Sequence, residues 1–267
     1  MSLDILSRLK DNLNKSGRSG TRIDYGTLLE DQLPGSDNLA LNPYDLFHPM
    51  PAYTTVLGIC EDGLPLVLDM NDPNPGAILI SGRRHTGKSE LMKSILYSAC
   101  STNNNDQIYF YLISPEPGNQ TGLEQLAHCY GVLSSYDKAA CELIYDLAAL
   151  IEQRKSGRHL GAKCILAIDN LYELIKHQDF DVLNHLKWLF RYGASNGIWV
   201  ISTIDDERQN LIEHDLLAEQ KTQILTGTGR NLLPDQTATY LEGINVITYK
   251  TRIGNDWINF WLPSTGY

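Results

Sequence analysis

The chain lacks the features that mark membrane-embedded, secreted or metal-cluster proteins. No apolar run reaches the ~18 residues that a transmembrane helix needs. The start of the chain has neither the basic segment nor the apolar segment of a signal peptide. Five scattered cysteines, odd in number and without a C-x-x-C pair, argue against a disulfide framework and a zinc site. We therefore expect a cytoplasmic protein with reduced thiols and no direct insertion into a membrane.

Basic charge is also scarce. The 22 Lys and Arg residues are outnumbered by 32 Asp and Glu residues, which gives a formal net charge of −10 and a pI near 5.1. Nonspecific DNA binding depends on clustered cations that neutralise phosphates. The acidic balance therefore disfavours DNA as a broad partner, while it leaves a local basic patch open.

What the chain does have is an ordinary globular composition, with 42% apolar and 20% charged residues over 267 positions. That length is enough for one large domain with its own hydrophobic core. Residues 1–52 contain an amphipathic segment, a Ser/Gly-rich stretch and several prolines, which predict a short helix followed by an extended arm. The arm either packs on its own domain or contacts another subunit, and residues 53–267 are expected to form the main domain.

Short apolar runs alternate with helical patterns through the main domain. Two runs, 56–60 and 64–68, flank an Asp-Gly pair and predict a β-hairpin. A buried strand is expected next, at 77–80. Further strands are expected at 108–113, 164–168, 198–203, 223–226 and 254–262, and helices near 88–100, 136–155, 179–195 and 234–241. Apolar strands separated by helices predict an α/β fold, with a mainly parallel sheet covered by helices on both faces.

The clearest motif is a loop of the form G-x-x-x-x-G-K-[ST], made of Gly82, Arg83, Arg84, His85, Thr86, Gly87, Lys88 and Ser89. It follows a strand and begins an amphipathic helix, which is the context of a phosphate-binding loop. The two glycines let successive N–H groups turn inward, and the helix N-terminus adds partial positive charge. The lysine would reach the β- and γ-phosphates of ATP, and the serine hydroxyl would ligate Mg²⁺.

Three variable positions of this loop carry side chains that can be cationic, namely Arg83, Arg84 and His85. Such a cluster is unusual in an acidic chain. These side chains either add contacts to phosphate, face a neighbouring subunit or are simply solvated.

A second motif follows the strand expected at 164–168. That strand ends in Asp169, a Walker B pattern in which a buried strand carries a carboxylate at its tip to hold Mg²⁺. The next residue, Asn170, occupies the position where related ATPases carry a glutamate base. An amide orients water but cannot take its proton. Glu173 is a candidate substitute, and its alternative is a solvated carboxylate at the start of a helix.

Several segments together resemble the motor domain of the FtsK/SpoIIIE family of DNA translocases. The matching stretches are the hairpin at 57–69, the strand and loop from 78 to 89, the helix end at 150–154, and the segments 169–174 and 194–203. The resemblance implies a RecA-like P-loop NTPase core that uses ATP and Mg²⁺. It also implies a homo-oligomeric ring, or a mixed assembly with other ATPase subunits, that moves DNA or, in the secretion branch, polypeptide.

Three positions depart from the family pattern. Asn170 replaces the catalytic glutamate, and Ala194 stands where an arginine would reach across the subunit interface. The sensor glutamine is replaced by Ile204 or Asp205. Arg191, one helical turn before Ala194, is the candidate replacement for the arginine. Because such an arginine contributes ~10³–10⁵ in rate, these departures predict ATP binding with slow turnover.

Two functions fit these observations. The first is a motor-type ATPase, weakly active, that acts on DNA or polypeptide. The second is a degenerate nucleotide-binding module that regulates or scaffolds a larger assembly without significant hydrolysis. A small-molecule kinase fits the leading hairpin and the distant Walker B motif less well. The expected site comprises residues 82–89 for the nucleotide, Ser89 and Asp169 for Mg²⁺, and Lys88, Asp169, Asn170, Glu173 and Arg191 for catalysis.

Overall fold

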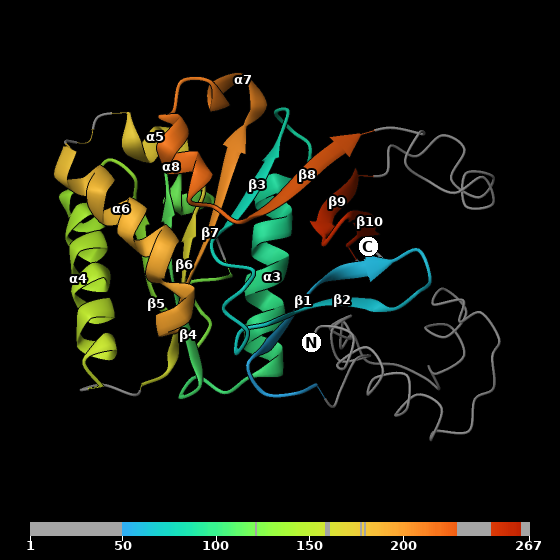
Figure 1. Ribbon diagram of the computed structural model, residues 1–267, viewed down its shortest axis with the longest axis horizontal. Helices are drawn as coiled ribbons and strands as arrows, with labels where there is room; N and C mark the ends of the chain where they lie inside the picture. Colours follow the sequence, from blue (N-terminus) through green and yellow to red (C-terminus); the bar gives the residue numbers. More distant parts are fainter. Residues whose placement is uncertain are drawn as a thin grey trace. The chain divides into compact units, whose positions relative to one another are not determined.

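A ten-stranded sheet organises the computed structural model (Figure 1), which describes residues 50–120, 122–157, 161–176, 178, 180–228 and 247–262. The strand order is β2-β1-β10-β9-β8-β3-β7-β6-β4-β5. The strands are β1 Thr54–Cys60, β2 Pro65–Asp69, β3 Ile78–Gly82, β4 Ile108–Ser114, β5 Cys129–Ser134, β6 Lys163–Ile168, β7 Ile198–Asp205, β8 Thr222–Thr228, β9 Ile247–Ile253 and β10 Asp256–Trp261. The expected helix at 234–241 and residues 1–49 of the expected arm lie outside the described residues.

Six neighbouring strands, from β8 to β5, pair in parallel. The remaining strands pair antiparallel, and they include the hairpin formed by β1 and β2. The α/β class, the mainly parallel sheet and the leading hairpin are therefore confirmed. The hairpin is not a separate element, because β1 also pairs with β10 and so extends the same sheet.

Helices cover both faces of the sheet (Figure 1). On one face α3 (Lys88–Thr102) contributes Leu91 and Ile95 to the core, while α4 (Lys138–Lys155) and α6 (Phe180–Tyr192) pack on the other. The short helices are α5 Leu171–Ile175, α7 Asp206–Gln209 and α8 His214–Ala218, and the 3-10 turns are η2 Pro117–Asn119 and η3 Ala194–Asn196. Apolar residues at i and i+4 give each long helix one buried stripe, which explains the two-sided core.

The hairpin is tied to the helix that follows the loop. The buried side chain of Asn103, at the end of α3, donates to the carbonyl oxygens of Thr54 and Ala99 at 2.9 Å and accepts from the backbone N–H of Tyr53 at 2.6 Å. Thr55 Oγ1 also donates to the carbonyl of Ile95 at 2.9 Å. These bonds satisfy buried backbone groups at the helix end and fix α3 against the hairpin.

Two strands, β5 and β9, are not among the expected elements. β5 lies at one edge of the sheet and contains Gly131, so it lacks the dense apolar run of a central strand. β9 alternates buried Tyr249 and Thr251 with outward Lys250 and Arg252. That alternation is typical of an antiparallel strand with one exposed face, and it differs from the continuous apolar pattern of the parallel strands.

Candidate functional site

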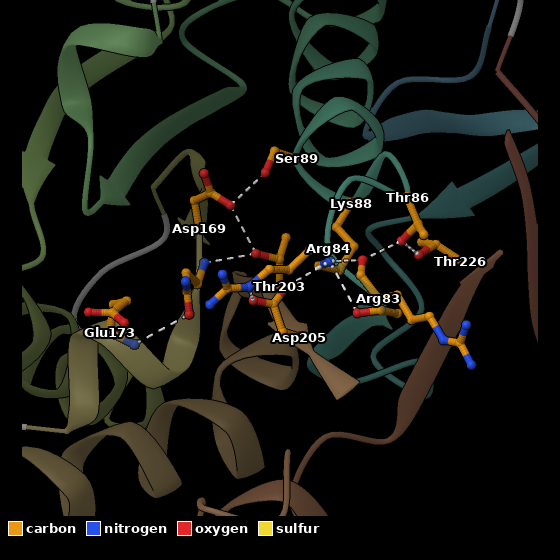
Figure 2. A network of polar contacts seen from close by, with 12 residues as sticks. Arg83, Arg84, Thr86, Lys88, Ser89, Asp169, Glu173, Thr203, Asp205 and Thr226 are labelled. Carbon is orange, nitrogen blue, oxygen red and sulfur yellow. Dashed lines mark hydrogen bonds and ion pairs between the residues drawn. The ribbon is translucent and has the colours of Figure 1, made fainter. Parts of the chain in front are cut away.

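The carboxyl ends of the parallel strands bring the motif residues together at one edge of the sheet. β3 ends at Gly82, directly opposite Asp205 at the end of its neighbour β7. On the other side of β7, β6 ends at Ile168 and is followed by Asp169. Ligand sites in open α/β sheets form at this edge. The phosphate-binding loop at 82–89, the Walker A loop, therefore meets Asp169, as the sequence predicts (Figure 2).

The first glycine of the loop is required by space. A Cβ atom at Gly82 would lie 2.0 Å from Oγ1 of Thr226 on β8 and 2.9 Å from Oγ1 of Thr86. Those two hydroxyls form a short hydrogen bond with each other, and Thr86 also donates to the carbonyl of Arg83 at 2.7 Å. The loop thus folds closely over the end of the sheet, in a way that excludes any side chain at position 82.

The second glycine starts α3. Gly87 has a φ of +79°, and a Cβ atom there would lie 2.6 Å from the hydroxyl of Tyr249. No side chain caps this helix end, so its first N–H groups are not bonded by a capping residue. Uncapped N–H groups and the helix dipole together favour an anion at this point. The cradle of backbone at 82–87 thus fits a phosphate chain.

Lys88 is folded back into the loop. Its ammonium donates to the carbonyl oxygens of Gly82 at 3.1 Å and Arg83 at 2.6 Å, and its side chain is only 9% exposed. It also lies 2.9 Å from Oδ1 of Asp205, whose Oδ2 lies 3.4 Å from Nε of Arg84. The lysine is therefore already paired with a carboxylate at the point where a terminal phosphate would approach.

The Walker B carboxylate contacts the Walker A serine. Ser89 Oγ donates to Oδ1 of Asp169 at 2.9 Å, and Thr203 Oγ1 on β7 donates to the same oxygen at 2.9 Å (Figure 2). A hydroxyl and a carboxylate are the hard oxygen donors that Mg²⁺ prefers, and Mg²⁺ sites commonly use one or two protein ligands with substrate phosphates. Ser89 and Asp169 therefore fit Mg²⁺ brought in with a nucleotide.

Asn170 does not direct its amide oxygen to this pair of side chains. The residue has a φ of +63°, and its side chain accepts from the N–H of Glu173 at 3.4 Å as the N-cap of α5. Its own N–H donates to Oγ1 of Thr203 at 2.8 Å. Its left-handed conformation and its capping bond give Asn170 a structural use in the turn after β6.

Glu173 lies in a cluster of donors. Its carboxylate is paired with Lys176 and Arg208, and it accepts from the hydroxyl of Tyr136 at 3.0 Å. The hydrogen bond from Lys176, followed by those from Arg208 and Tyr136, lowers the pKa of Glu173 to about 2. A carboxylate so stabilised is a weak base. The geometry favours the structural alternative for Glu173, with ion pairs in place of simple solvation.

Arg191 lies apart from the other candidate residues. It occupies the last turn of α6, before η3 and the start of β7, whereas the loop lies at the end of β7. Its guanidinium forms a two-pronged ion pair with Glu219 and is 56% exposed. The hydrogen bond from Arg191 lowers the pKa of Glu219. Arg191 is therefore exposed at the surface, and within its own chain it lies away from Lys88 and Asp169.

Three polar residues at the site are not among those expected from the motifs: Gln120, Thr203 and Thr226. Thr203 and Thr226 lie near the carboxyl ends of β7 and β8, and Gln120 follows the η2 turn after β4, so all three lie toward the end of the parallel strands where ligands bind in such sheets. No local motif marks these residues, because they reach the site only through the pairing of distant strands. The loop exposes the side chains of Arg83, Arg84 and His85, which is compatible with solvation and with a contact to a neighbouring subunit.

Neither a metal cluster nor a membrane-spanning helix is found in the described part of the chain. There, no group of three or more His, Cys, Asp or Glu side chains is arranged to hold a metal ion. None of the described helices combines the length and apolarity needed to cross a bilayer. All five cysteines are free, and burial raises the pKa of the Cys164 thiol to about 12, which makes it unreactive.

A parallel sheet with this loop between its central strand and a helix defines the class of P-loop nucleotide-binding domains. Within that class, a sequence model of the FtsK/SpoIIIE family matches residues 52–231, well over half of the chain. The chain belongs to the FtsK/SpoIIIE family, so the resemblance seen in the sequence is confirmed.

Solved structures share the RecA-like fold. EssC (ATPases 2 and 3) from Geobacillus thermodenitrificans has a TM-score of 0.62 at 20% identity, over 86% of this chain and 48% of that one. The cytoplasmic domain of the type VII secretion ATPase EccC from Thermomonospora curvata has a TM-score of 0.60 at 18% identity, over 80% and 27%. The pCW3 conjugation coupling protein TcpA, solved as a monomer with ATPγS, has a TM-score of 0.60 at 18% identity, over 86% and 70%.

The chain thus spans less than half the length of the EccC and EssC structures it matches. Identities of this size establish the fold alone. No curated protein matches the chain.

Proposed function

We propose that this chain binds ATP with Mg²⁺ as a subunit of an oligomeric, motor-type ATPase, and that its own turnover is slow. The observation that carries the proposal is the 2.9 Å contact between Ser89 and Asp169, directly beside the uncapped start of α3 and the buried Lys88. In this arrangement the negative phosphates would lie at the positive N-terminal end of α3, beside the ammonium of Lys88 and the Mg²⁺ held by Ser89 and Asp169. Family membership supports nucleotide binding as the shared property.

In this proposal the loop residues have distinct roles. Gly82 and Gly87 allow the backbone to approach the phosphates, and Thr86 fixes the loop to β8 through Thr226. Lys88 would leave Asp205 and bind the β- and γ-phosphates, while Ser89 and Asp169 would hold Mg²⁺. The exposed side chains at 83–85 would face the phosphates or a neighbouring subunit.

Slow turnover follows from what surrounds the Walker B carboxylate. Asn170 caps α5, and Glu173 is neutralised by Lys176 and Arg208. The Asn170 amide cannot accept a proton, and the low pKa of Glu173 makes its carboxylate a weak base. A ring or mixed assembly would offer a remedy, because a neighbour can supply a base while the exposed Arg191 reaches the neighbour's site. Such an assembly would act on DNA or on polypeptide, and the net charge of −10 favours polypeptide.

A second function is a nucleotide-binding module that stabilises or switches an assembly without significant hydrolysis. The capping role of Asn170 favours it, because that side chain is already committed to the turn after β6. The arm at residues 1–52 would then contact partners.

One sample distinguishes the two functions. ATP binding and ATP turnover are measured together on the purified chain, with and without DNA. Micromolar binding with measurable turnover that DNA or a polypeptide accelerates would favour the motor. Binding without turnover would favour the module. Absence of binding would contradict both.

A further inference from the structure

Gln120 is a buried polar residue that no motif includes. It directly follows the η2 turn, on the side of β6 away from β7, and only 3% of it is exposed. Its Nε2 group lies 3.3 Å from Oγ of Ser114, at the end of β4, and 3.4 Å from Oδ2 of Asp169. A side chain from a different segment therefore reaches the Walker B carboxylate.

The two oxygens of Asp169 have different neighbours. Oδ1 accepts hydrogen bonds from Ser89 and Thr203, both at 2.9 Å. Among the described residues, Gln120 is the donor at Oδ2. Its bond there is long and therefore weak. Oδ2 thus keeps free acceptor capacity on the side where Gln120 lies.

The other end of the amide is unused. Oε1 of Gln120 is buried and has no hydrogen-bond partner among the described residues. Leaving a buried acceptor unpaired costs about 1–3 kcal/mol. Such groups call for an explanation, and ligands or ordered water at functional sites are common ones. Here the unpaired oxygen lies on the side chain that also contacts the Walker B carboxylate.

We propose that Gln120 is a positioning residue of the nucleotide site. Its Nε2 holds the carboxylate of Asp169, and its Oε1 accepts a hydrogen bond from water of the bound Mg²⁺·ATP. This inference rests on the proposed function, because it assigns a role in the same site. In this inference Gln120 supplies the amide that orients water at the site, because the amide of Asn170 is used to cap α5.

A purely structural role makes a different prediction. If Gln120 only joined the η2 turn to β4, its replacement by leucine would alter stability and leave the site unchanged. If Gln120 is a positioning residue, the protein should fold equally well with leucine at position 120. The reason is that the polar contacts of Gln120 are long and its Oε1 is unpaired among the described residues, so leucine, of similar size, loses little. Stability and Mg²⁺ dependence therefore separate the two roles.

The test is calorimetric titration of ATP into the full chain, with Mg²⁺ and with EDTA, for wild type and Gln120→Leu. We expect the affinity in EDTA to stay within about twofold, while the tightening that Mg²⁺ gives falls by about tenfold, as for other residues that orient a metal ligand. The melting temperature should not fall. Gln220→Leu is the matched control, since Gln220 is also buried with an unpaired amide atom. It precedes β8 and so lies at the amino ends of the parallel strands, away from the nucleotide site at their carboxyl ends.

Full Mg²⁺ tightening in Gln120→Leu would overturn the inference while the proposed function stands. Equal losses in Mg²⁺ and EDTA, together with a lower melting temperature, would also overturn it, because they indicate a structural role. Wild-type protein that binds no ATP under either condition would overturn the proposed function itself, and this inference with it.

Discussion

The ammonium of Lys88 lies 2.9 Å from Oδ1 of Asp205, so the phosphate-binding lysine is paired with the residue at the end of β7. The pairing is set by sheet register, because Gly82 and Asp205 are direct neighbours on β3 and β7. A nucleotide must displace this carboxylate to reach the lysine, and it must then tolerate the negative charge nearby. Asp205 should therefore weaken ATP binding.

Replacing Asp205 by asparagine should tighten ATP binding by ~3–10-fold, because one like charge beside the γ-phosphate is removed. Titration calorimetry at fixed Mg²⁺ measures the change. Asp206→Asn is the matched control, since Asp206 is the exposed next residue, at the start of α7, whereas Lys88 pairs with Asp205. Unchanged or weaker binding in Asp205→Asn would show that the carboxylate does not compete with phosphate.

Replacing Gly82 by alanine should destabilise the domain by about 1–3 kcal/mol, since the added Cβ would overlap Oγ1 of Thr226. Thermal melting should show a fall of several degrees. Gly118→Ala serves as the control, because nothing lies within 4 Å of the Cβ position there. Equal melting temperatures for the two variants would mean that the loop does not pack on β8 as described.

Glu173→Gln should lower stability near neutral pH and have little effect near pH 2. Lys176, Arg208 and Tyr136 lower the pKa of Glu173 to about 2 in the folded state, below its unfolded value. The stabilisation is therefore complete above the unfolded pKa and is lost as the pH falls through about 2. Chemical denaturation of both proteins between pH 7 and pH 2 measures it. The exposed pair of Glu142 with Lys138 gives a control, and Glu142→Gln should change little.

Most of the fold follows from the sequence, because parallel strands buried on both faces are continuous apolar runs. The Ile108–Ser114 and Ile198–Asp205 strands are of this kind, and both were expected within two residues. The same rule fails for β9, whose outward Lys250 and Arg252 interrupt the apolar pattern. Strand order across the sheet is also absent from local patterns, since it depends on long-range pairing.

The site divides in the same way. The Walker loop and Asp169 are local motifs, so their meeting at one edge was predictable. The contacts of Gln120 and Asp205 depend on which strand tips become neighbours, and no local pattern contains that information. Sequence alone also left Glu173 open as a base, because its partner Arg208 lies after β7, in a separate part of the chain.

Arg191→Ala should leave ATP affinity unchanged and lower turnover, because Arg191 is exposed and lies away from its own loop. If it acts on a neighbour's nucleotide, the loss should approach the ~10³-fold typical of such arginines. Steady-state turnover measured beside binding tests this, with the exposed Arg252→Ala as a control. Equal turnover in wild type and Arg191→Ala would assign the residue to its ion pair with Glu219 alone.

The most direct test of the whole account is ATP binding to the wild-type chain and to Lys88→Ala, measured by calorimetry with Mg²⁺ present. Lys138→Ala, which removes an exposed lysine from α4, is the control. We predict micromolar binding for wild type and Lys138→Ala, and a loss of more than about tenfold for Lys88→Ala. Equal affinities in all three proteins, or no binding by the wild type, would contradict the account.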